Sequence, residues 1–245
     1  MRELAGLLRS LVIYYGQFWR NANRRRFYGQ FVRAGSLCFD IGAHVGDRVR
    51  TFRQLGARVV AVEPQPLLQT VLRALYGRDR DVVLRSLGVG SVAGRLTLSV
   101  SSRSPTLSTL SKDWIAEVQA DQRFRSTEWD RQLEIEVTTL DALVARYGAP
   151  AFCKIDVEGF EQHVLQGLST PLAALSFEYI PVSVERAVAC VTRLTELGNY
   201  EFRHSVRETM RWADPRWLSA AEICAGLRAL PLEDPSGDVY ARLIS

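Results

Sequence analysis

The sequence contains little lysine, few cysteines and no long apolar run, and each absence argues against a class of protein. Only Lys112 and Lys154 are lysines, so 29 of the 31 basic side chains, and hence the formal net charge of +4, depend on arginine. Such a bias can follow genome base composition, and a pI near 9.0 permits an acidic partner without demonstrating one. Because no RNA-binding module is recognisable, we expect no nucleic-acid partner.

The four cysteines lie far apart in the sequence, form no CxxC pair, and have no histidine at metal-ligand spacing. Two of them, Cys38 and Cys153, lie within apolar segments, which is typical of small core residues in a reducing compartment. The pattern argues against a disulfide scaffold and against a structural zinc site. We therefore expect a cytoplasmic protein.

No segment approaches the roughly 18 uninterrupted apolar residues of a membrane-spanning helix. An N-terminal extension, residues 1–34, nevertheless has apolar side chains at helical spacing, namely Leu4, Leu8, Leu11, Tyr15 and Phe18. This periodicity predicts an amphipathic helix. A basic cluster, Arg20 and Arg24 to Arg26, follows this helix. The helix would pack on the domain, pack on a second copy to give a homodimer, lie on a membrane surface, or contact an anionic substrate. The sequence leaves these alternatives open.

Residues 35–245 are predicted to form one globular domain, which suits a chain of 245 residues with 47% hydrophobic content. Short apolar strands alternate with helical segments, and this alternation predicts an α/β fold with a doubly wound, mostly parallel sheet. Ligands bind such a sheet at the carboxyl ends of its strands. The expected strands are 36–41, 58–62, 81–85, 134–138, 151–155, 173–179 and 239–243, and the expected helices are 47–55, 67–76, 140–146, 160–167, 184–197 and 220–230.

The segment between the third and fourth expected strands is less regular. We expect a hairpin around Gly94, then a Ser/Thr-rich loop and a helical insertion. Residues 101–131 would form a lid over the site. Within the lid, Trp114 and Trp129, together with arginines, would either recognise a sugar or an anionic glycan or serve in ordinary packing.

The most informative segment is FDIGAHVG, residues 39–46, in which a strand leads into a glycine turn and then a helix. Glycines admit positive φ and let a ligand approach the backbone closely. The second strand ends at Glu63 and Pro64, where a carboxylate can accept hydrogen bonds from both hydroxyls of a ribose. An ordinary turn would explain the glycines but not Asp40 together with Glu63. The pair therefore indicates a nucleoside cofactor.

Two cofactor classes compete for this turn. A dinucleotide site has the pattern G-x-G-x-x-G, but a match begun at Gly42 puts His44 and Asp47 where two of the glycines belong. Asp47, in the first helical turn, would also repel a pyrophosphate. S-adenosylmethionine has no phosphate, and its ammonium and sulfonium cations suit the acid Asp40. The turn therefore favours S-adenosylmethionine over NAD.

A second informative segment is CKIDVEGFEQHVLQG, residues 153–167, in which an apolar strand ends in two carboxylates and a lysine. With this segment the sequence resembles the FkbM-type family of class I, S-adenosylmethionine-dependent methyltransferases. The resemblance rests on FDIGAHVGD, VVAVEPQP, VTTLDAL, FCKIDVEGFEQHVLQGL and LSFEYI, which occur in that family's order over residues 36–180.

The resemblance implies a Rossmann-like sheet of seven strands, the last one antiparallel, and methyl transfer, usually to a hydroxyl oxygen. It also implies a set of site residues. Carried over by position, the cofactor-binding residues are Asp40, Gly42, Ala43 and Gly46 for the methionine part, Glu63 for the ribose, Pro64, Ser86 and Leu87 beside the adenine, and Asp156 near the methyl group. Glu158 would face the acceptor together with Asp156, and Glu178 would lie at the end of the next strand.

Methyl transfer to an alcohol requires a general base, because the hydroxyl loses its proton as the new bond forms. The candidates are Asp156, Glu158, His44 and His163, and Asp156 is preferred because burial at a strand end would raise its basicity. Alternatively, Asp156 and Glu158 only fix the turn by hydrogen bonds, or Asp156 only contacts the cofactor. Lys154 would neutralise one of these carboxylates or contact the substrate. No third ligand is identifiable beside them, so we expect no metal ion.

We therefore predict an O-methyltransferase that uses S-adenosylmethionine and acts on a small-molecule or glycan acceptor, a carbohydrate or a secondary metabolite. One alternative is a non-catalytic nucleoside-binding or scaffold module with the same fold. Another is an RNA methyltransferase.

Overall fold

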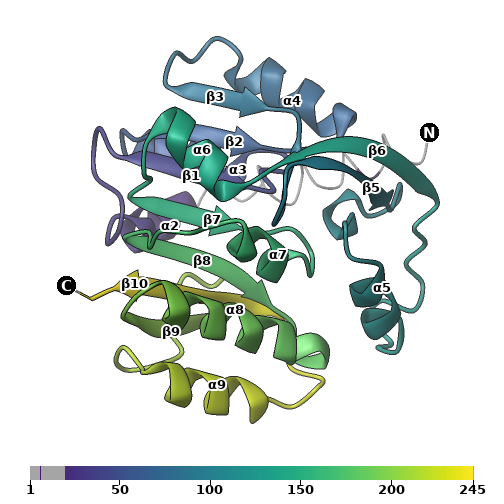
Figure 1. Cartoon of the computed structure of the whole chain (residues 1–245), viewed down its shortest axis with the longest axis vertical. Helices are drawn as coiled ribbons and strands as arrows, with labels where there is room; N and C mark the ends of the chain where they lie inside the picture. The colour runs from purple at the N-terminus through teal and green to yellow at the C-terminus, as the bar shows by residue number, and fades with distance from the viewer. Residues whose placement is uncertain (1–5, 7–19, 245) are drawn as a thin grey trace.

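The computed structural model describes residue 6 and residues 20–244 (Figure 1). The apolar residues of the helix predicted from Leu4 to Phe18 lie outside this part. The described part of the extension contains helix α2 (Arg20–Tyr28), which packs on α3 (Asp47–Gln54) and buries Phe27 and Tyr28. None of the described helices is both long enough and apolar enough to cross a membrane.

The first half of the domain is a β-α-β-α-β unit whose ends agree with the predicted ones to within one residue. Its elements are β1 (Leu37–Ile41), α3, β2 (Arg58–Val62), α4 (Pro66–Tyr76) and β3 (Val82–Arg85). β1 pairs in parallel with β2, and β2 pairs in parallel with β3. The carboxyl ends of these strands therefore share one edge of the sheet.

The second half completes a seven-stranded sheet in the order β3-β2-β1-β7-β8-β10-β9. β10 is antiparallel to both of its neighbours, which confirms the expected α/β, Rossmann-like class with one antiparallel last strand. The elements are α6 (Leu140–Tyr147), β7 (Phe152–Ile155), α7 (Glu161–Gln166), β8 (Ala174–Tyr179), the 3-10 turn η2 (Pro181–Ser183), α8 (Val184–Leu197), β9 (Tyr200–Val206), α9 (Ala220–Arg228) and β10 (Gly237–Leu243).

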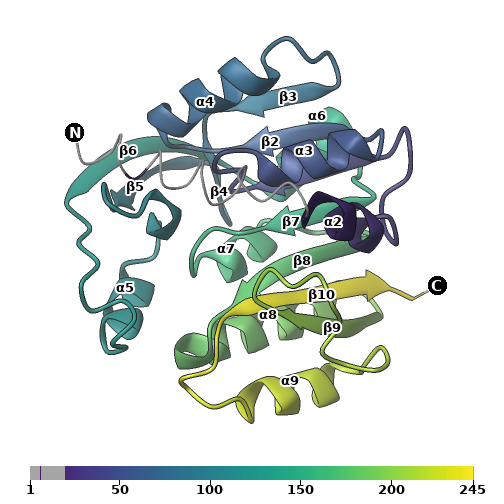
Figure 2. The same cartoon turned by 180° about the vertical axis from the view of Figure 1, so that it is seen from behind.

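Helices cover both faces of the sheet (Figures 1 and 2). Successive side chains of a strand point to opposite faces, so β1 serves two cores. Phe39 and Ile41 belong to the core that includes side chains of α6, α7, α8 and α9, whereas Cys38 belongs to the core that includes side chains of α2, α3 and α4. Both faces of the parallel strands are therefore apolar, and polar side chains on them are exceptions that need a reason.

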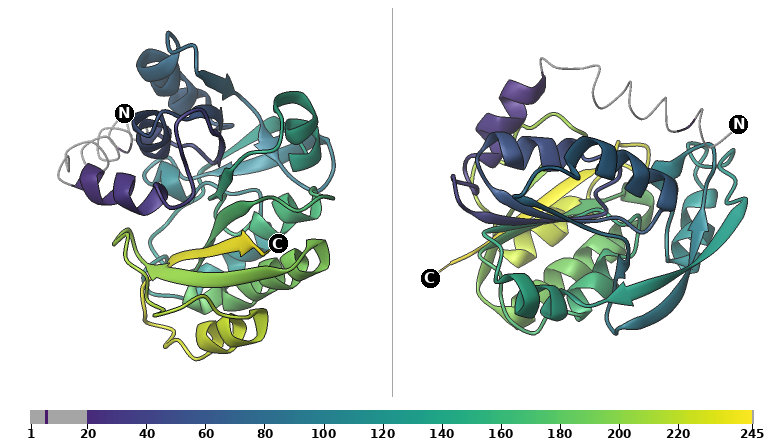
Figure 3. Two further views of the ribbon diagram at one scale, coloured as in Figure 1. Left: turned by 90° about the vertical axis from the view of Figure 1, so that its left-hand side faces the viewer. Right: turned by 90° about the horizontal axis from the view of Figure 1, so that it is seen from above.

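The irregular segment forms a second sheet of three strands beside the carboxyl edge of the first (Figure 3). Its elements are β4 (Gly88–Val89), β5 (Gly94–Val100), the 3-10 turn η1 (Pro105–Leu107), α5 (Lys112–Gln119) and β6 (Arg131–Thr138). The predicted hairpin around Gly94 is wrong, because β6 lies between β4 and β5 and pairs with both. The partner of β5 is thus a strand that follows the lid in the sequence. The residues of a local turn cannot predict such a long-range pairing. The predicted helical insertion is limited to α5.

Candidate functional site

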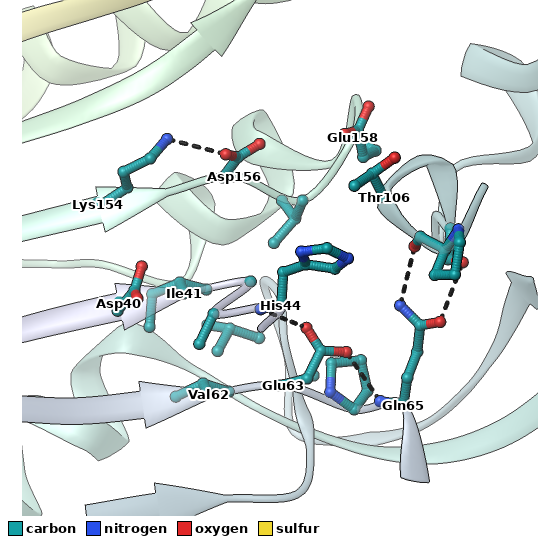
Figure 4. A pocket seen from close by; sticks show the side chains of 18 of the residues that line it. Asp40, Ile41, His44, Val62, Glu63, Gln65, Thr106, Lys154, Asp156 and Glu158 are labelled. Atoms are coloured by element: carbon teal, nitrogen blue, oxygen red, sulfur yellow. Dashed lines mark hydrogen bonds and ion pairs between the residues drawn. The ribbon is translucent and has the colours of Figure 1, made fainter. Parts of the chain in front are cut away.

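A pocket opens at the carboxyl ends of β1, β2 and β7, the edge of the sheet that the sequence predicts (Figure 4). It contains about 890 Å³ of space between protein atoms, part of it open to solvent, which is within the range of small-molecule sites. The turns after these three strands form most of its wall. The insertion closes the remaining side with Pro105, Thr106 and Ser108.

Two charged side chains from neighbouring strands lie at one end of the pocket. Asp40 on β1 is in register with Lys154 on β7, so both point to the face covered by α2 and α3. Asp40 is 2% exposed, and its Oδ2 has no hydrogen-bond partner among the described residues. Burial and the nearby Asp47 raise the pKa of Asp40 to about 7, against the opposing charges of Lys154 and Arg48. A buried acceptor without a partner is suited to a ligand that donates a hydrogen bond.

The turn after β1 requires glycine at position 42. Gly42 has a φ of 84°, and a Cβ at this position would lie 1.8 Å from the carbonyl oxygen of Asp156. The backbone N–H of Asp156 donates to the carbonyl of Ile41 at 2.9 Å. The turns after β1 and β7 are therefore in direct backbone contact, and a side chain at position 42 would separate them.

Glu63 follows β2 and is 3% exposed. Its two carboxylate oxygens accept the backbone N–H groups of His44, at 3.0 Å, and Gln65, at 2.9 Å. Burial raises the pKa of Glu63 to about 7, although both hydrogen bonds oppose the shift. The carboxylate thus ties the turn after β1 to the turn after β2 and still has acceptor capacity toward the pocket.

Asp156 follows β7 and is paired with Lys154. The Lys154 ammonium lies 2.9 Å from Oδ2 of Asp156 and 3.1 Å from Oδ1 of Asp238, on β10. The Lys154 side chain is 3% exposed, and although burial opposes its charge, the two carboxylates raise its pKa well above the usual value. The Asp156 side chain is 35% exposed, so the strong burial expected for it is absent.

Three carboxylates lie close together at the carboxyl ends of β7 and β8. Asp156, Glu158 and Glu178 each offer an oxygen within 4.8 Å of the others. Burial and the surrounding carboxylates raise the pKa of both Glu158 and Glu178 well above the ordinary value. The sequence argument against a metal ion relied on the lack of a third ligand, and Glu178 corrects that argument because it supplies one. The donor set is of the kind that Mg²⁺ and Ca²⁺ accept.

A network of buried charges closes the end of the pocket next to Asp40. Arg48, in the first turn of α3, donates to the carboxylates of Asp47 and Glu208 and, at 3.0 Å, to the hydroxyl of Tyr28. Arg24 of α2 pairs with the same two carboxylates. Burial would raise the pKa of Glu208, but Arg48 and Arg24 lower it to about 2. Glu208 is therefore ionised at neutral pH.

The structure brings most of the predicted site residues together. Those that line the pocket are Asp40, Gly42, Ala43, His44, Glu63, Pro64, Leu87, Lys154, Asp156 and Glu158. Gly46 and Ser86 lie outside the lining, and Gly46 instead packs against Tyr76 of α4. His163 also lies outside it, stacked on Phe160. Trp114 and Trp129 pack against each other and, like the lid arginines, do not reach the pocket.

Three charged residues at or beside the pocket were not predicted from the sequence. Arg48 and Glu208 line it, and Asp238 holds Lys154 from behind. Glu208 and Asp238 come from the C-terminal third of the chain, far in sequence from the motifs. A signal existed for Asp238, because it is a lone acid in an apolar strand and therefore needs a buried partner.

The chain is similar to one family model and to several solved structures. Residues 40–208 match the model of the methyltransferase FkbM domain, and no curated protein matches the chain. The chain is similar to precorrin-6y C5,15-methyltransferase of Geobacter metallireducens, with 10% identity over 90% of this chain and 86% of that one and a TM-score of 0.48. It is also similar to a TehB-like SAM-dependent methyltransferase of Corynebacterium glutamicum, with 10% identity over 94% and 96% of the two chains and a TM-score of 0.44.

The matched segment contains every predicted site residue, whereas α2 and β10 lie outside it. Two of the charged groups at the Asp40 end of the pocket, Arg24 and Asp238, therefore come from parts of the chain that the domain model does not cover.

Proposed function

The chain belongs to the FkbM family of methyltransferases, whose methyl donor is S-adenosylmethionine, and we propose that it methylates a hydroxyl oxygen of a carbohydrate or a secondary metabolite. The observation that carries this proposal is a carboxylate-lined pocket that places hydrogen-bond acceptors for a cationic cofactor next to a candidate base. When bound, the cofactor supplies an electrophilic methyl group on a sulfonium.

The residues of the pocket fit this cofactor. The unpaired Oδ2 of Asp40 suits an ammonium, and Glu63 has acceptor capacity for ribose hydroxyls. Apolar side chains such as Leu87 and Leu98 line another part of the wall and suit the adenine ring. Of the lining side chains, the carboxylates outnumber the cations, which favours a positively charged ligand in a protein whose formal net charge is +4.

We assign the general base to Glu158 and not to Asp156, which the sequence favoured. One carboxylate oxygen of Asp156 is already engaged by the Lys154 ammonium, at 2.9 Å. Burial and its carboxylate neighbours raise the pKa of Glu158 above the ordinary value, toward the working pH at which a general base is most effective. In this assignment Glu158 accepts the hydroxyl proton, and Lys154 and Asp156 fix the turn that carries it.

The charges around the pocket favour an uncharged acceptor. Asp156 and Glu158 line it, and none of the arginines of the lid, residues 101–131, does so. Carboxylates accept hydrogen bonds from hydroxyl groups and repel anions, so a neutral polyhydroxylated acceptor is favoured over an anionic glycan or RNA.

The test is methyl transfer from radiolabelled S-adenosylmethionine to neutral glycosides, uronic-acid glycosides and RNA oligonucleotides, with the methylated atom identified by NMR. We expect O-methylation of a neutral glycoside. Glu158→Gln should lower the rate about a hundredfold or more while the affinity for S-adenosylhomocysteine is kept. Methylation of nitrogen, carbon or RNA would contradict the proposal, and so would cofactor binding without transfer to any hydroxyl.

A further inference from the structure

The carboxylate of the cofactor's amino-acid tail is the one anion that this acidic pocket must accept. Six lining residues carry carboxylates: Asp40, Asp47, Glu63, Asp156, Glu158 and Glu208. Among the described lining residues, only Arg48 and Lys154 carry permanent positive charge. Because an anion among carboxylates is stabilised when it meets a cation, these two side chains are the candidates to hold it.

Lys154 is poorly suited to this role. Its ammonium has three donors and already serves two buried carboxylates, those of Asp156 and Asp238. The group of three therefore has a net charge of −1 when all are ionised. A further carboxylate at this ammonium would be opposed by both of its neighbours.

Arg48 is better suited by its charge and its donors. Arg24 and Arg48 balance Asp47 and Glu208, so these four side chains are neutral together. Asp47, Glu208 and Tyr28 engage three of the N–H groups of Arg48. A guanidinium has five, so two stay available to a ligand. The Arg48 side chain is 4% exposed and held from three sides, so little conformational entropy is lost on binding.

We propose that Arg48 binds the carboxylate of the cofactor's amino-acid tail, and that Glu208 and Tyr28 position its guanidinium. The inference depends on the cofactor occupying the pocket described above, but not on the identity of the methyl acceptor. It also gives helix α2 a role in the site, because Tyr28 and Arg24 both belong to it and lie outside the segment matched by the domain model.

The proposal is tested by calorimetric titration, without any methyl acceptor, of three ligands: S-adenosylhomocysteine, its decarboxylated analogue, and 5′-methylthioadenosine. Removal of the carboxylate should weaken binding to the wild-type protein about tenfold or more, the value of a charge-assisted hydrogen bond. Arg48→Met should weaken the binding of S-adenosylhomocysteine by a similar factor. It should also abolish the coupling between Arg48 and the carboxylate, that is, the difference in affinity between S-adenosylhomocysteine and its decarboxylated analogue. This loss of coupling distinguishes a direct contact from general damage to the pocket.

Two further variants sharpen the test. Arg53 lies on the same helix, α3, and pairs with Asp79 at the surface. The Arg53→Met variant should therefore keep the full coupling. Glu208→Gln, which removes the carboxylate that positions Arg48, should reduce the coupling without abolishing it. If Arg48→Met fails to fold, Arg48→Lys keeps the charge with fewer donors and should retain part of the coupling.

The inference is overturned if the wild-type protein binds both ligands equally, or if the coupling survives in Arg48→Met and is lost in Lys154→Met. A protein that binds none of the three ligands would overturn the cofactor pocket as well. Binding that is tight but independent of the carboxylate would overturn this inference alone.

Discussion

The turn after β1 and the lid insertion line the same pocket, but they are held in place by different means. The turn is held by backbone contacts at Gly42 and Ile41 and by the carboxylate of the nearby Glu63, which accepts the backbone N–H of His44. The insertion is held by side chains that reach elements far away in the sequence. The indole of Trp114 packs where a Cβ of Gly159 would lie, 2.2 Å from its ring.

Two further contacts fix the insertion. Arg186 of α8 forms a bidentate pair with Glu117 of α5 and also donates to the carbonyl of Gly159. The hydroxyl of Thr109 donates to the carbonyl of Glu158 at 2.6 Å. The insertion is therefore attached to the turn that carries Glu158, whereas the cofactor side is built around β1 and β2. We expect cofactor binding and methyl transfer to respond separately to changes in the two regions.

The largest effect is expected from Gly42→Ala. The methyl group would clash with the carbonyl of Asp156, and alanine at a φ of 84° is strained in addition. The free energy of unfolding should fall by about 3 kcal/mol or more, with loss of S-adenosylhomocysteine binding. Thermal unfolding and calorimetry measure the two effects.

Gly94→Ala is the matched control on the insertion side, because a Cβ at Gly94 has no atom within 4 Å. Its stability should stay within about 0.5 kcal/mol of wild type. Equal losses in the two variants would contradict the rigid contact between the turns after β1 and β7.

A smaller and more local effect is expected from Trp114→Ala. Trp114 is fully buried, so truncation should cost the insertion about 3 kcal/mol of local stability. Hydrogen exchange should become faster in residues 112–130, and methyl transfer should fall because Glu158 loses its support. The affinity for S-adenosylhomocysteine should stay within about tenfold of wild type. Trp114→Phe, which keeps an aromatic ring against Gly159, is the control. If Trp114→Ala lost as much cofactor binding as Gly42→Ala, the separation of the two regions would be refuted.

The same contrast explains what could be predicted from the sequence. Asp40, Glu63 and Asp156 were predictable because each lies at the carboxyl end of an apolar strand, and parallel strands bring their carboxyl ends together whatever lies between them. The pairing of β5 with β6 and the position of Glu208 beside Arg48 depend on long-range packing. Local periodicity carries no information on such contacts. The burial of Asp156 was misjudged for the same reason, since the end of a buried strand need not itself be buried.

The smallest effect we predict is a pH dependence of cofactor binding that depends in part on Glu63. Its pKa is raised to about 7 by burial, and ribose hydroxyls donate to the ionised form. The affinity for S-adenosylhomocysteine should therefore rise severalfold between about pH 6 and about pH 8, with release of a proton on binding.

Glu63→Gln should weaken binding at the upper pH and flatten only part of this dependence, because Asp40, whose pKa is also raised to about 7, titrates in the same range. Glu161 provides the control. It is equally buried and its pKa is also about 7, but Glu161 does not line the pocket, and its carboxylate accepts the N–H groups of Val157 and Gly159. Glu161→Gln should leave the pH dependence unchanged. If it flattens the profile as much as Glu63→Gln does, the proton lost on binding comes from the turn after β7, and the ribose is not held by Glu63.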